Sequence, residues 1–410
     1  MDARNGFRQI VIPLVTIAAL LAGSSAALSG ADVAATPSLA IGPAEQNAAW
    51  RQQIDLGQRL QAEGRMGAAE QAFAAALSQA EAFGPTDVRL GASLNSLALF
   101  YHSQGRLDSA EALYHRALTV LEQGLGTTHP DTAKILSSIV GVHLARQESV
   151  AALPFAERRL RILESHVDAP VADRLDALDT LSLIHFIEGR FPEAERFQQR
   201  ALDLVRRDYA RETPETAGGL SNLGVIHAAR ERFSSAASAL EEAYDIRRAI
   251  GAGETLEAAR DLGHLAETYA ERMQMAEAER LLLESIRLRR RLLPERHPEL
   301  ATAMNNLGEV FRGQGVATSA EQYFRQALEI WMTVAGPQHL ETAISLNNLA
   351  EALRDQKRYV EAEEFFERAL RAFTHNLGAD HPKVAQATHT YEETRRLARV
   401  TTASGGPTVF

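Results

Sequence analysis

The fold is decided by one stretch, LNSLALFYHSQGRLDSAEALYHRALTVLEQGLGTTHP, residues 94–130. Apolar residues recur at helical spacing on both sides of Gly105, which indicates two amphipathic helices. A glycine at that point supplies the backbone freedom that a tight turn between two helices requires. The stretch ends in His129-Pro130, and proline suits the first position of the next helix because its missing N–H would be unpaired there. The stretch therefore predicts a helix–turn–helix hairpin.

The hairpin pattern recurs along the chain with a period of 42 residues. One further repeat precedes the others at an offset of 41 residues, with Leu56 and Ala69 at the matching positions. Self-similarity at a fixed period indicates a stacked array, in which each repeat contacts only its neighbours, and it favours binding along an extended surface. Alanine recurs because two helices joined by a short turn approach closely only when a small side chain lies at their crossing. The apolar row is Leu97, Ile139, Leu181, Leu223, Leu265, Leu307 and Leu349, and the alanine row is Ala110, Ala152, Ala194, Ala236, Ala278, Ala320 and Ala362.

Three small residues of the hairpin carry a family resemblance: Ala98, Ala110 twelve positions on, and Ala117 seven further. This spacing resembles the tetratricopeptide repeat, whose usual length is about 34 residues. The strings LNNLAEALRDQKRYVEAEEFFERAL and MNNLGEVFRGQG, which begin at residues 346 and 304, resemble its 42-residue kinesin-light-chain variety.

The resemblance covers residues 50–384 and implies an all-α, right-handed superhelical solenoid of about eight helix-turn-helix repeats. It also implies that the first helix of each repeat lines a concave groove. We predict an array over residues 47–400, which includes a polar capping helix at residues 384–399 because the end of an array must be soluble.

The third repeat departs from the pattern. Gln147-Glu148 replaces the turn glycine, Pro154 falls inside the second helix, and Arg159 replaces the second alanine. Proline inside a helix removes a hydrogen bond and kinks the backbone, so we expect local kinking or looser packing there.

The first 31 residues lie outside the array and have the layout of a targeting sequence. Arg4 and Arg8 give a basic start, residues 10–21 are largely apolar, and small residues follow. This order predicts a secretory signal peptide cleaved after Ala26 or Ala31, and hence a secreted or periplasmic protein. The alternative is an uncleaved N-terminal anchor that holds the repeats at a membrane, because the apolar stretch is near the lower limit for a span.

Two short segments flank the array. Residues 32–46 are rich in Ala, Pro, Gly and Ser, so we expect a flexible lead there. Residues 401–410, TTASGGPTVF, are expected to be a disordered tail.

The composition excludes several classes of function. The net charge is −10, whereas nucleic-acid binding needs a basic face that neutralises phosphates. The chain has no cysteine, which excludes disulfides and zinc sites that use cysteine. No phosphate-binding glycine loop, nucleophile elbow, dinucleotide fingerprint or HExxH motif occurs in the sequence. We therefore expect a protein that is not an enzyme, with no catalytic residue and no cofactor.

The chain has 13 histidines, so a metal site must be considered. His143, His185 and His227 share one repeat position, which is aromatic in other repeats. Equivalent positions on adjacent parallel helices lie ~10 Å apart, whereas zinc ligands must each lie ~2 Å from the ion. We therefore expect half-buried histidines in place of an aromatic residue, and no metal site.

Asparagines in the implied groove are the first candidate binding residues. Asn222, Asn306 and Asn348 share one row, although asparagine is a poor residue for a helix interior. An amide offers both a donor and an acceptor, which suits the backbone of an extended peptide. Kinesin-light-chain-type arrays use groove asparagines in this way, so the resemblance implies the same role here. The alternative is that these asparagines tie neighbouring helices together.

Four further residues complete the predicted groove site. Leu183 and Phe186 offer apolar contacts in the middle repeats, and Arg312 and Arg354 are candidates to hold carboxylates of a partner. Each arginine lies three residues after a glutamate, so the alternative is that the two satisfy each other. We predict an exported scaffold that binds an extended segment of a protein or peptide. The alternative is a self-associating or structural component of the cell envelope that uses its outer face, and the oligomeric state stays open.

Overall fold

The computed structural model describes residues 44–209 and 211–403. This part of the chain forms seventeen α-helices and no strand, as the repeat pattern predicted. The predicted signal peptide, most of the predicted lead and residues 404–410 of the predicted tail lie outside the described residues. The helices are α3 (Ala44–Ala62), α4 (Met66–Glu81), α5 (Val88–Ser103), α6 (Leu107–Leu125), α7 (Pro130–Ala145), α8 (Ser149–Ser165), α9 (Val171–Ile187), α10 (Phe191–Asp208), α11 (Pro214–Ala229), α12 (Phe233–Ala249), α13 (Leu256–Glu271), α14 (Met275–Leu292), α15 (Pro298–Gly313), α16 (Ala317–Val334), α17 (Leu340–Asp355), α18 (Tyr359–Leu377) and α19 (Pro382–Ala403).

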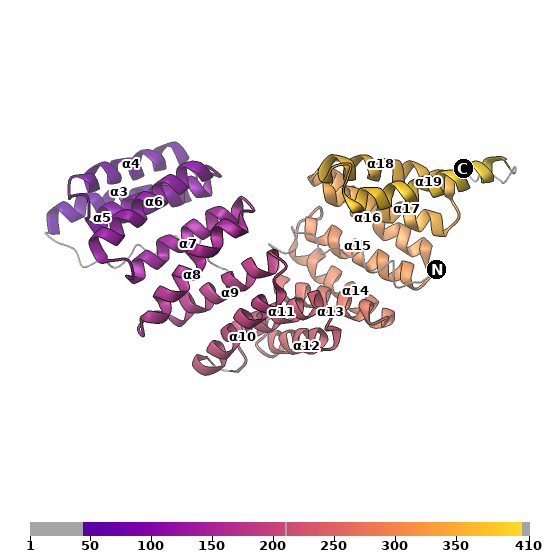
Figure 1. The fold of residues 1–410 in the computed structure, drawn as a ribbon, viewed down its shortest axis with the longest axis horizontal. Helices are drawn as coiled ribbons and strands as arrows, with labels where there is room; N and C mark the ends of the chain where they lie inside the picture. The colour runs from indigo at the N-terminus through magenta and orange to yellow at the C-terminus, as the bar shows by residue number, and fades with distance from the viewer. Residues whose placement is uncertain (1–43, 210, 404–410) are drawn as a thin grey trace. The chain divides into compact units, whose positions relative to one another are not determined.

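The described chain divides into two compact parts between Arg211 and Glu212. We call them the N-terminal half, α3–α10, and the C-terminal half, α11–α19. Each half contains four helix–turn–helix repeats, whose helix pairs follow one another in chain order (Figure 1). The single helix α19 closes the C-terminal half, which confirms the predicted capping helix.

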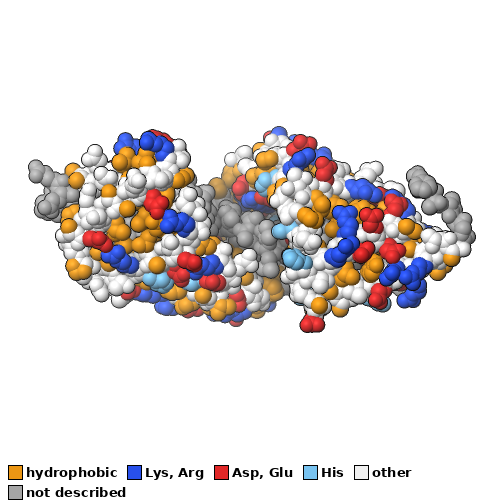
Figure 2. Space-filling view, turned by 90° about the horizontal axis from the view of Figure 1, so that it is seen from above, with side chains coloured by type: hydrophobic (Ala, Val, Ile, Leu, Met, Phe, Trp, Pro, Cys, Tyr) orange, Lys and Arg blue, Asp and Glu red, His pale blue; other side chains and the backbone are white. Residues whose placement is uncertain are grey.

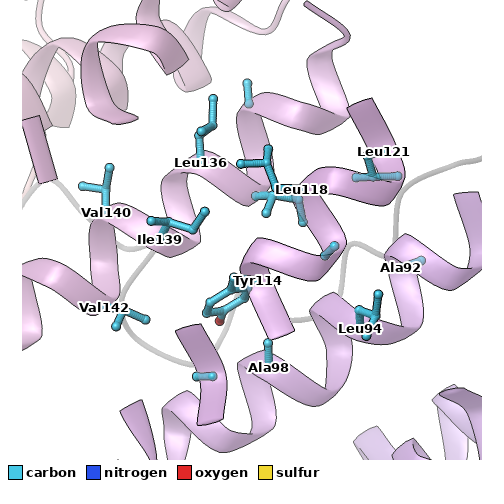
Figure 3. Close-up of a cluster of buried hydrophobic side chains, with 14 of the residues drawn as sticks. Ala92, Leu94, Ala98, Tyr114, Leu118, Leu121, Leu136, Ile139, Val140 and Val142 are labelled. Carbon is cyan, nitrogen blue, oxygen red and sulfur yellow. The ribbon is translucent and has the colours of Figure 1, made fainter. Parts of the chain in front are cut away.

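The alanine row lies where each pair of helices crosses. The first alanine of every repeat, from Ala69 to Ala362, is 0% exposed. The residue after the apolar row is small for the same reason, because a Cβ added to Gly308 would lie 2.5 Å from the ring of Phe324. Around these crossings, side chains of α5, α6 and α7 form a continuous apolar core, in which Tyr114 is fully buried (Figure 3).

The turn between the two helices of a repeat always contains one residue in the left-handed region. Glycine occupies this position in four repeats, as at Gly105 with a φ of 71°. Gln147, Glu231, Met273 and Lys357 occupy it in the other four, with φ between 56° and 62°. In the third repeat, α8 starts after this turn and continues through Pro154 without ending.

Histidines in the loops begin several helices. The Nδ1 atoms of His129, His297 and His339 each accept a hydrogen bond from the backbone N–H two residues later, at 3.2 Å. This is the N-cap arrangement, which satisfies one of the free N–H groups at a helix start. The loop histidines therefore have a structural role.

The first helices of the repeats form the inner face of each half. Within a half, the first helices of most consecutive repeats contact one another, whereas the second helices are farther apart. This difference curves the stack, so that α3, α5, α7 and α9 face inward in one half and α11, α13, α15 and α17 in the other. No helix among residues 44–209 and 211–403 combines the length and apolar character needed to cross a membrane.

Candidate functional site

Asn306 is tied to the neighbouring repeat. Its Nδ2 atom on α15 donates a hydrogen bond to Oε1 of Glu267 on α13, at 2.5 Å. This is the arrangement that the alternative interpretation of the asparagine row describes. Any partner that used this N–H group would have to displace Glu267.

Asn222 and Asn348 differ from Asn306 because their amides are unpaired. Asn222 on α11 is 6% exposed, and its buried Nδ2 atom has no hydrogen-bond partner. Asn348 on α17 is half-buried and forms no side-chain hydrogen bond within the described chain. Unpaired buried amides are rare because each costs the free energy of its lost hydration. The row therefore contains two amides with free hydrogen-bonding capacity, and the predicted peptide-binding role stays a prediction.

A row of glutamates runs along the inner face of the C-terminal half, and we call it the carboxylate ladder. Its members occupy one repeat position on four successive inner helices: Glu267, Glu309, Glu351 and Glu393. Acidic and basic side chains are intermingled over the C-terminal half rather than separated into patches (Figure 2).

The two predicted groove arginines bridge the steps of this ladder. Arg312 lies 3.3 Å from Glu309 of its own helix and 3.5 Å from Glu351 of the next. Arg354 repeats the arrangement, at 2.7 Å from Glu351 and 3.8 Å from Glu393. Both arginines therefore have intramolecular partners, and their role in holding a partner's carboxylates stays a prediction.

The ladder has more carboxylates than cations. Burial raises the pKa of Glu309, and the attraction of Arg312 only partly opposes this effect. Burial likewise raises the pKa of Glu351, against the attraction of Arg354 and Arg312. Asp355 adds a further carboxylate, 3.6 Å from Arg312. An incoming cation would therefore find carboxylates that two arginines do not fully neutralise.

The predicted apolar contacts in the middle repeats differ from each other in accessibility. Phe186 is 5% exposed, and its ring packs edge-on against Phe191 with 5.3 Å between the centroids. Leu183, one turn earlier on α9, is half-buried. Leu183 therefore offers more surface to a partner than Phe186 does.

The shared histidine position holds packing residues. His143 is 8% exposed and stacks on Phe155 at 5.7 Å between ring centroids. His185 is 5% exposed and stacks on Phe197 at 5.3 Å. Among the residues that the structure describes, no group of three or more His, Cys, Asp or Glu side chains could hold a metal ion.

Neither Glu267 nor Glu393 was chosen from the sequence as a binding residue. The sequence signal for both is the 42-residue step, because Glu267 lies one repeat before Glu309 and Glu393 lies one repeat after Glu351. Extending the row to Glu393 shows that Arg354, like Arg312, lies between two glutamates.

Comparison with known proteins supports the fold. The tetratricopeptide repeat family matches residues 89–165, 173–249, 255–333, 309–375 and 341–399. A search of curated proteins found no match.

Three solved structures illustrate the structural similarity. A tetratricopeptide repeat protein from Parabacteroides merdae is 16% identical, with 73% of this chain and 100% of that chain covered and a TM-score of 0.52. A signal transduction ATPase with a tetratricopeptide repeat sensor, from Pyrococcus horikoshii, is 12% identical, with 84% and 48% covered and a TM-score of 0.57. A putative kinesin light chain from Podosopora anserina is 20% identical, with 51% and 98% covered and a TM-score of 0.45.

At these identities, the two structures with TM-scores above 0.5 show a shared fold alone. The fold is typically that of a non-catalytic scaffold, and proteins that carry it generally bind protein partners. Because the 42-residue period, the buried alanine row and a family match over more than half of the sequence agree, the chain belongs to the tetratricopeptide repeat family.

Proposed function

We propose that this protein is a non-catalytic scaffold whose inner face binds an extended segment of a protein partner. The observation that carries the proposal is the unpaired, half-buried amide of Asn348 on the inner helix α17 of the C-terminal half. An amide can donate to a backbone carbonyl and accept from a backbone N–H, so it recognises an extended chain with little regard to sequence.

The carboxylate ladder adds a preference for charge. A carboxylate of the partner would have to compete with Glu309 and Glu351 for Arg312, whereas a lysine or arginine would meet surplus carboxylates. We therefore propose that the segment bound at the C-terminal half carries basic residues. Such an interaction should weaken as salt is raised, because exposed charges are screened.

The test of the inner face compares two asparagines that differ in their hydrogen bonds. Peptides selected from a random display library against the full chain are measured by titration calorimetry with the Asn348→Ala and Asn306→Ala variants. Asn348→Ala should weaken binding by ~1 kcal/mol, about fivefold, with unchanged stability. Asn306→Ala should lower stability by ~1 kcal/mol, because it removes the hydrogen bond to Glu267.

Gln322→Ala, at an exposed position of the second helix α16, is the matched control and should change neither quantity. Equal affinities for the wild type and the Asn348→Ala variant would refute the inner-face proposal. Self-association through the outer face, the alternative function, predicts instead a mass that rises with concentration in analytical ultracentrifugation.

We also propose that the protein is exported, on the basis of the basic, apolar and small-residue order of residues 1–31. Cleavage predicts a mature N-terminus at Ala27 or Asp32, which N-terminal sequencing of the purified protein can determine. A full-length product in the membrane fraction would support the anchor instead.

A further inference from the structure

A hollow of about 430 Å³ lies on the inner face of the N-terminal half, between α5 and α7. Its walls come from apolar and polar residues of α5, α6, α7, α8 and α9. Two of the apolar ones, Ala92 and Leu121, are labelled in Figure 3. This volume falls within the range of about 300–1,000 Å³ that is typical of small-molecule sites. A site of this kind needs, in addition, polar groups that can fix a ligand.

Two polar side chains that line the hollow have no hydrogen-bond partner. Asn95 of α5 and Ser137 of α7 occupy the same repeat position, and the Oδ1 atom of Asn95 is buried without a donor. The Ser137 hydroxyl bonds to no other residue of the described chain. In the C-terminal half, Asn305 at this position donates to Ser345 at 2.8 Å, but Ile135 replaces that serine beside Asn95. Asn95 therefore lacks the hydrogen bond that the Nδ2 atom of Asn305 makes to the next repeat, and the Oδ1 atom of each asparagine is buried without a donor.

The two basic side chains that line the hollow are paired within the chain. Arg159, 7% exposed, pairs with Asp176 at 2.5 Å, and Lys134 pairs with Asp131 at 2.8 Å. Asp173 lies in the first turn of α9, where the helix dipole stabilises a carboxylate. An anion in the hollow would have to break one of these two ion pairs, so the lining favours a ligand without a negative charge.

The hollow lies at the irregular third repeat. Arg159 occupies the position that holds an alanine in repeats two and four, at Ala117 and Ala201, and it lines the hollow together with Leu163 of the same helix. The irregular third repeat therefore coincides with the hollow and with the two unpaired polar groups.

We propose that this hollow is a binding site for a small uncharged ligand that carries an amide group on an aliphatic body. The amide of Asn95 is self-complementary to an amide of the ligand, since each offers one donor face and one acceptor face. The hydroxyl of Ser137 gives a second hydrogen bond, and Leu99 and Leu163 cover the aliphatic body. This inference goes beyond the proposed scaffold function and does not depend on the amides of the C-terminal half.

The test uses N-acetyl-leucine methylamide as the probe and the full chain labelled with ¹⁵N-asparagine. Titration should produce a saturable shift of the side-chain NH₂ resonance of Asn95, identified by its loss in the Asn95→Ala variant. That variant should bind the probe at least fivefold more weakly and keep its helix content, because alanine is the better helix former. Asn347→Ala changes the same repeat position in the eighth repeat, away from the hollow, and should bind as the wild type does.

Three results would overturn the proposal. The first is equal binding by the Asn95→Ala and Asn347→Ala variants. The second is tighter binding of N-acetyl-leucine, whose carboxylate carries a charge, than of the neutral probe. The third is binding of the capped tripeptide acetyl-Ala-Leu-Ala-methylamide more than tenfold tighter than the probe, because that would assign the hollow to a residue of a bound chain. A failure of the peptide experiments on Asn348 would leave these outcomes unchanged.

Discussion

The contact between α5 and α7 and the contact between α15 and α17 use the same repeat positions but different chemistry. In the C-terminal half, Asn305 donates to Ser345 at 2.8 Å, and Arg312 reaches Glu351 at 3.5 Å. In the N-terminal half, the positions of Ser345, Arg312 and Glu351 hold Ile135, His102 and Gly141. Polar side chains therefore bond across the contact between α15 and α17, whereas a hollow lies at the contact between α5 and α7.

This difference teaches what a repeat does and does not determine. The frame of alanines and leucines fixes where each side chain lies, because it fixes how the helices cross. The frame leaves open whether a polar side chain finds a partner, because that partner belongs to the next repeat. Two repeats with similar sequences can thus present either a closed contact or free hydrogen-bonding groups.

The two tryptophans allow each half to be measured separately. Trp50 of α3 and Trp331 of α16 are both 4% exposed, so their fluorescence reports the unfolding of their own half. In the predictions below, Trp331→Phe chains report the N-terminal half and Trp50→Phe chains report the C-terminal half, each by urea denaturation.

The largest expected effect is the loss of the central arginine of the carboxylate ladder. Arg312→Met should lower the free energy of unfolding of the C-terminal half by ~3 kcal/mol, because it leaves Glu309, Glu351 and Asp355 without their shared cation. The unfolding monitored by Trp50 should not change, because coupling in arrays is between neighbours.

The cost of Arg312→Met should depend on pH. Burial already raises the pKa of Glu309 and Glu351, and removing the cation raises both pKa values further above those of the unfolded chain. The variant therefore gains stability relative to the wild type as pH falls, and the difference should shrink between pH 8 and pH 5. Arg371→Met, which removes an exposed pair with Glu367, is the control; a loss of equal size there would contradict the ladder.

The next effect compares two equivalent carboxylates, Asp131 of α7 and Glu341 of α17. Asp131 pairs with Lys134 at 2.8 Å, but Ile344 replaces that lysine beside Glu341. Burial raises the pKa of Glu341 to about 7, and Lys383 lowers it only partly. A carboxyl whose folded pKa lies above its unfolded value stabilises at low pH, and this contribution is lost as pH rises through about 7.

Glu341→Gln should therefore stabilise the C-terminal half by ~2 kcal/mol at pH 8 and flatten the fall in stability between pH 5 and pH 7. Asp131→Asn should have the opposite sign in the N-terminal half, with a loss below ~1 kcal/mol, because it weakens a partly exposed ion pair. Urea denaturation at four pH values measures the stability change that each variant causes. Changes of the same sign would contradict the prediction that Lys134 makes the two carboxylates behave differently.

A smaller effect is expected from the hydrogen bond that closes the contact between α15 and α17. Ser345→Ala should destabilise the C-terminal half by ~1–2 kcal/mol, because it leaves the Asn305 amide buried without its acceptor. Ser137→Ala should cost less than ~0.5 kcal/mol, because this hydroxyl has no partner to lose. Similar losses for the two variants would mean that the hollow is already closed by a bond to Ser137.

The sequence was informative where a residue's role depends on its own repeat. The 42-residue steps located seven first-row alanines, from Ala110 to Ala362, and an offset of 41 residues located Ala69; the structure buries each of the eight completely. Phe186 illustrates the limit, since its position on the inner helix was predicted but its packing against Phe191 was not.

The asparagine row shows the same limit across repeats. Asn306 is bonded to Glu267, whereas Glu309, the equivalent glutamate before Asn348, pairs with Arg312 of its own helix. The sequence pattern gives the two asparagines the same repeat position, so it cannot predict which of them is hydrogen-bonded. The difference depends on the side-chain rotamers of a neighbouring helix. The hollow at Asn95 was missed for the same reason.

The smallest expected effect concerns the turns, which are alike in the two halves. Gln147 and Lys357 are exposed and hold φ values of 62° and 61°, a region that costs a residue with a Cβ free energy that glycine does not pay. Gln147→Gly and Lys357→Gly should each stabilise their own half by ~0.5–1 kcal/mol, as monitored by Trp50 and Trp331 respectively. Equal gains would show that the hairpins are energetically equivalent, so that the halves differ through contacts between inner helices. A gain in one half alone would instead show that the hairpins of the two halves also differ in energy. The contacts between inner helices would then explain only part of the difference between the halves.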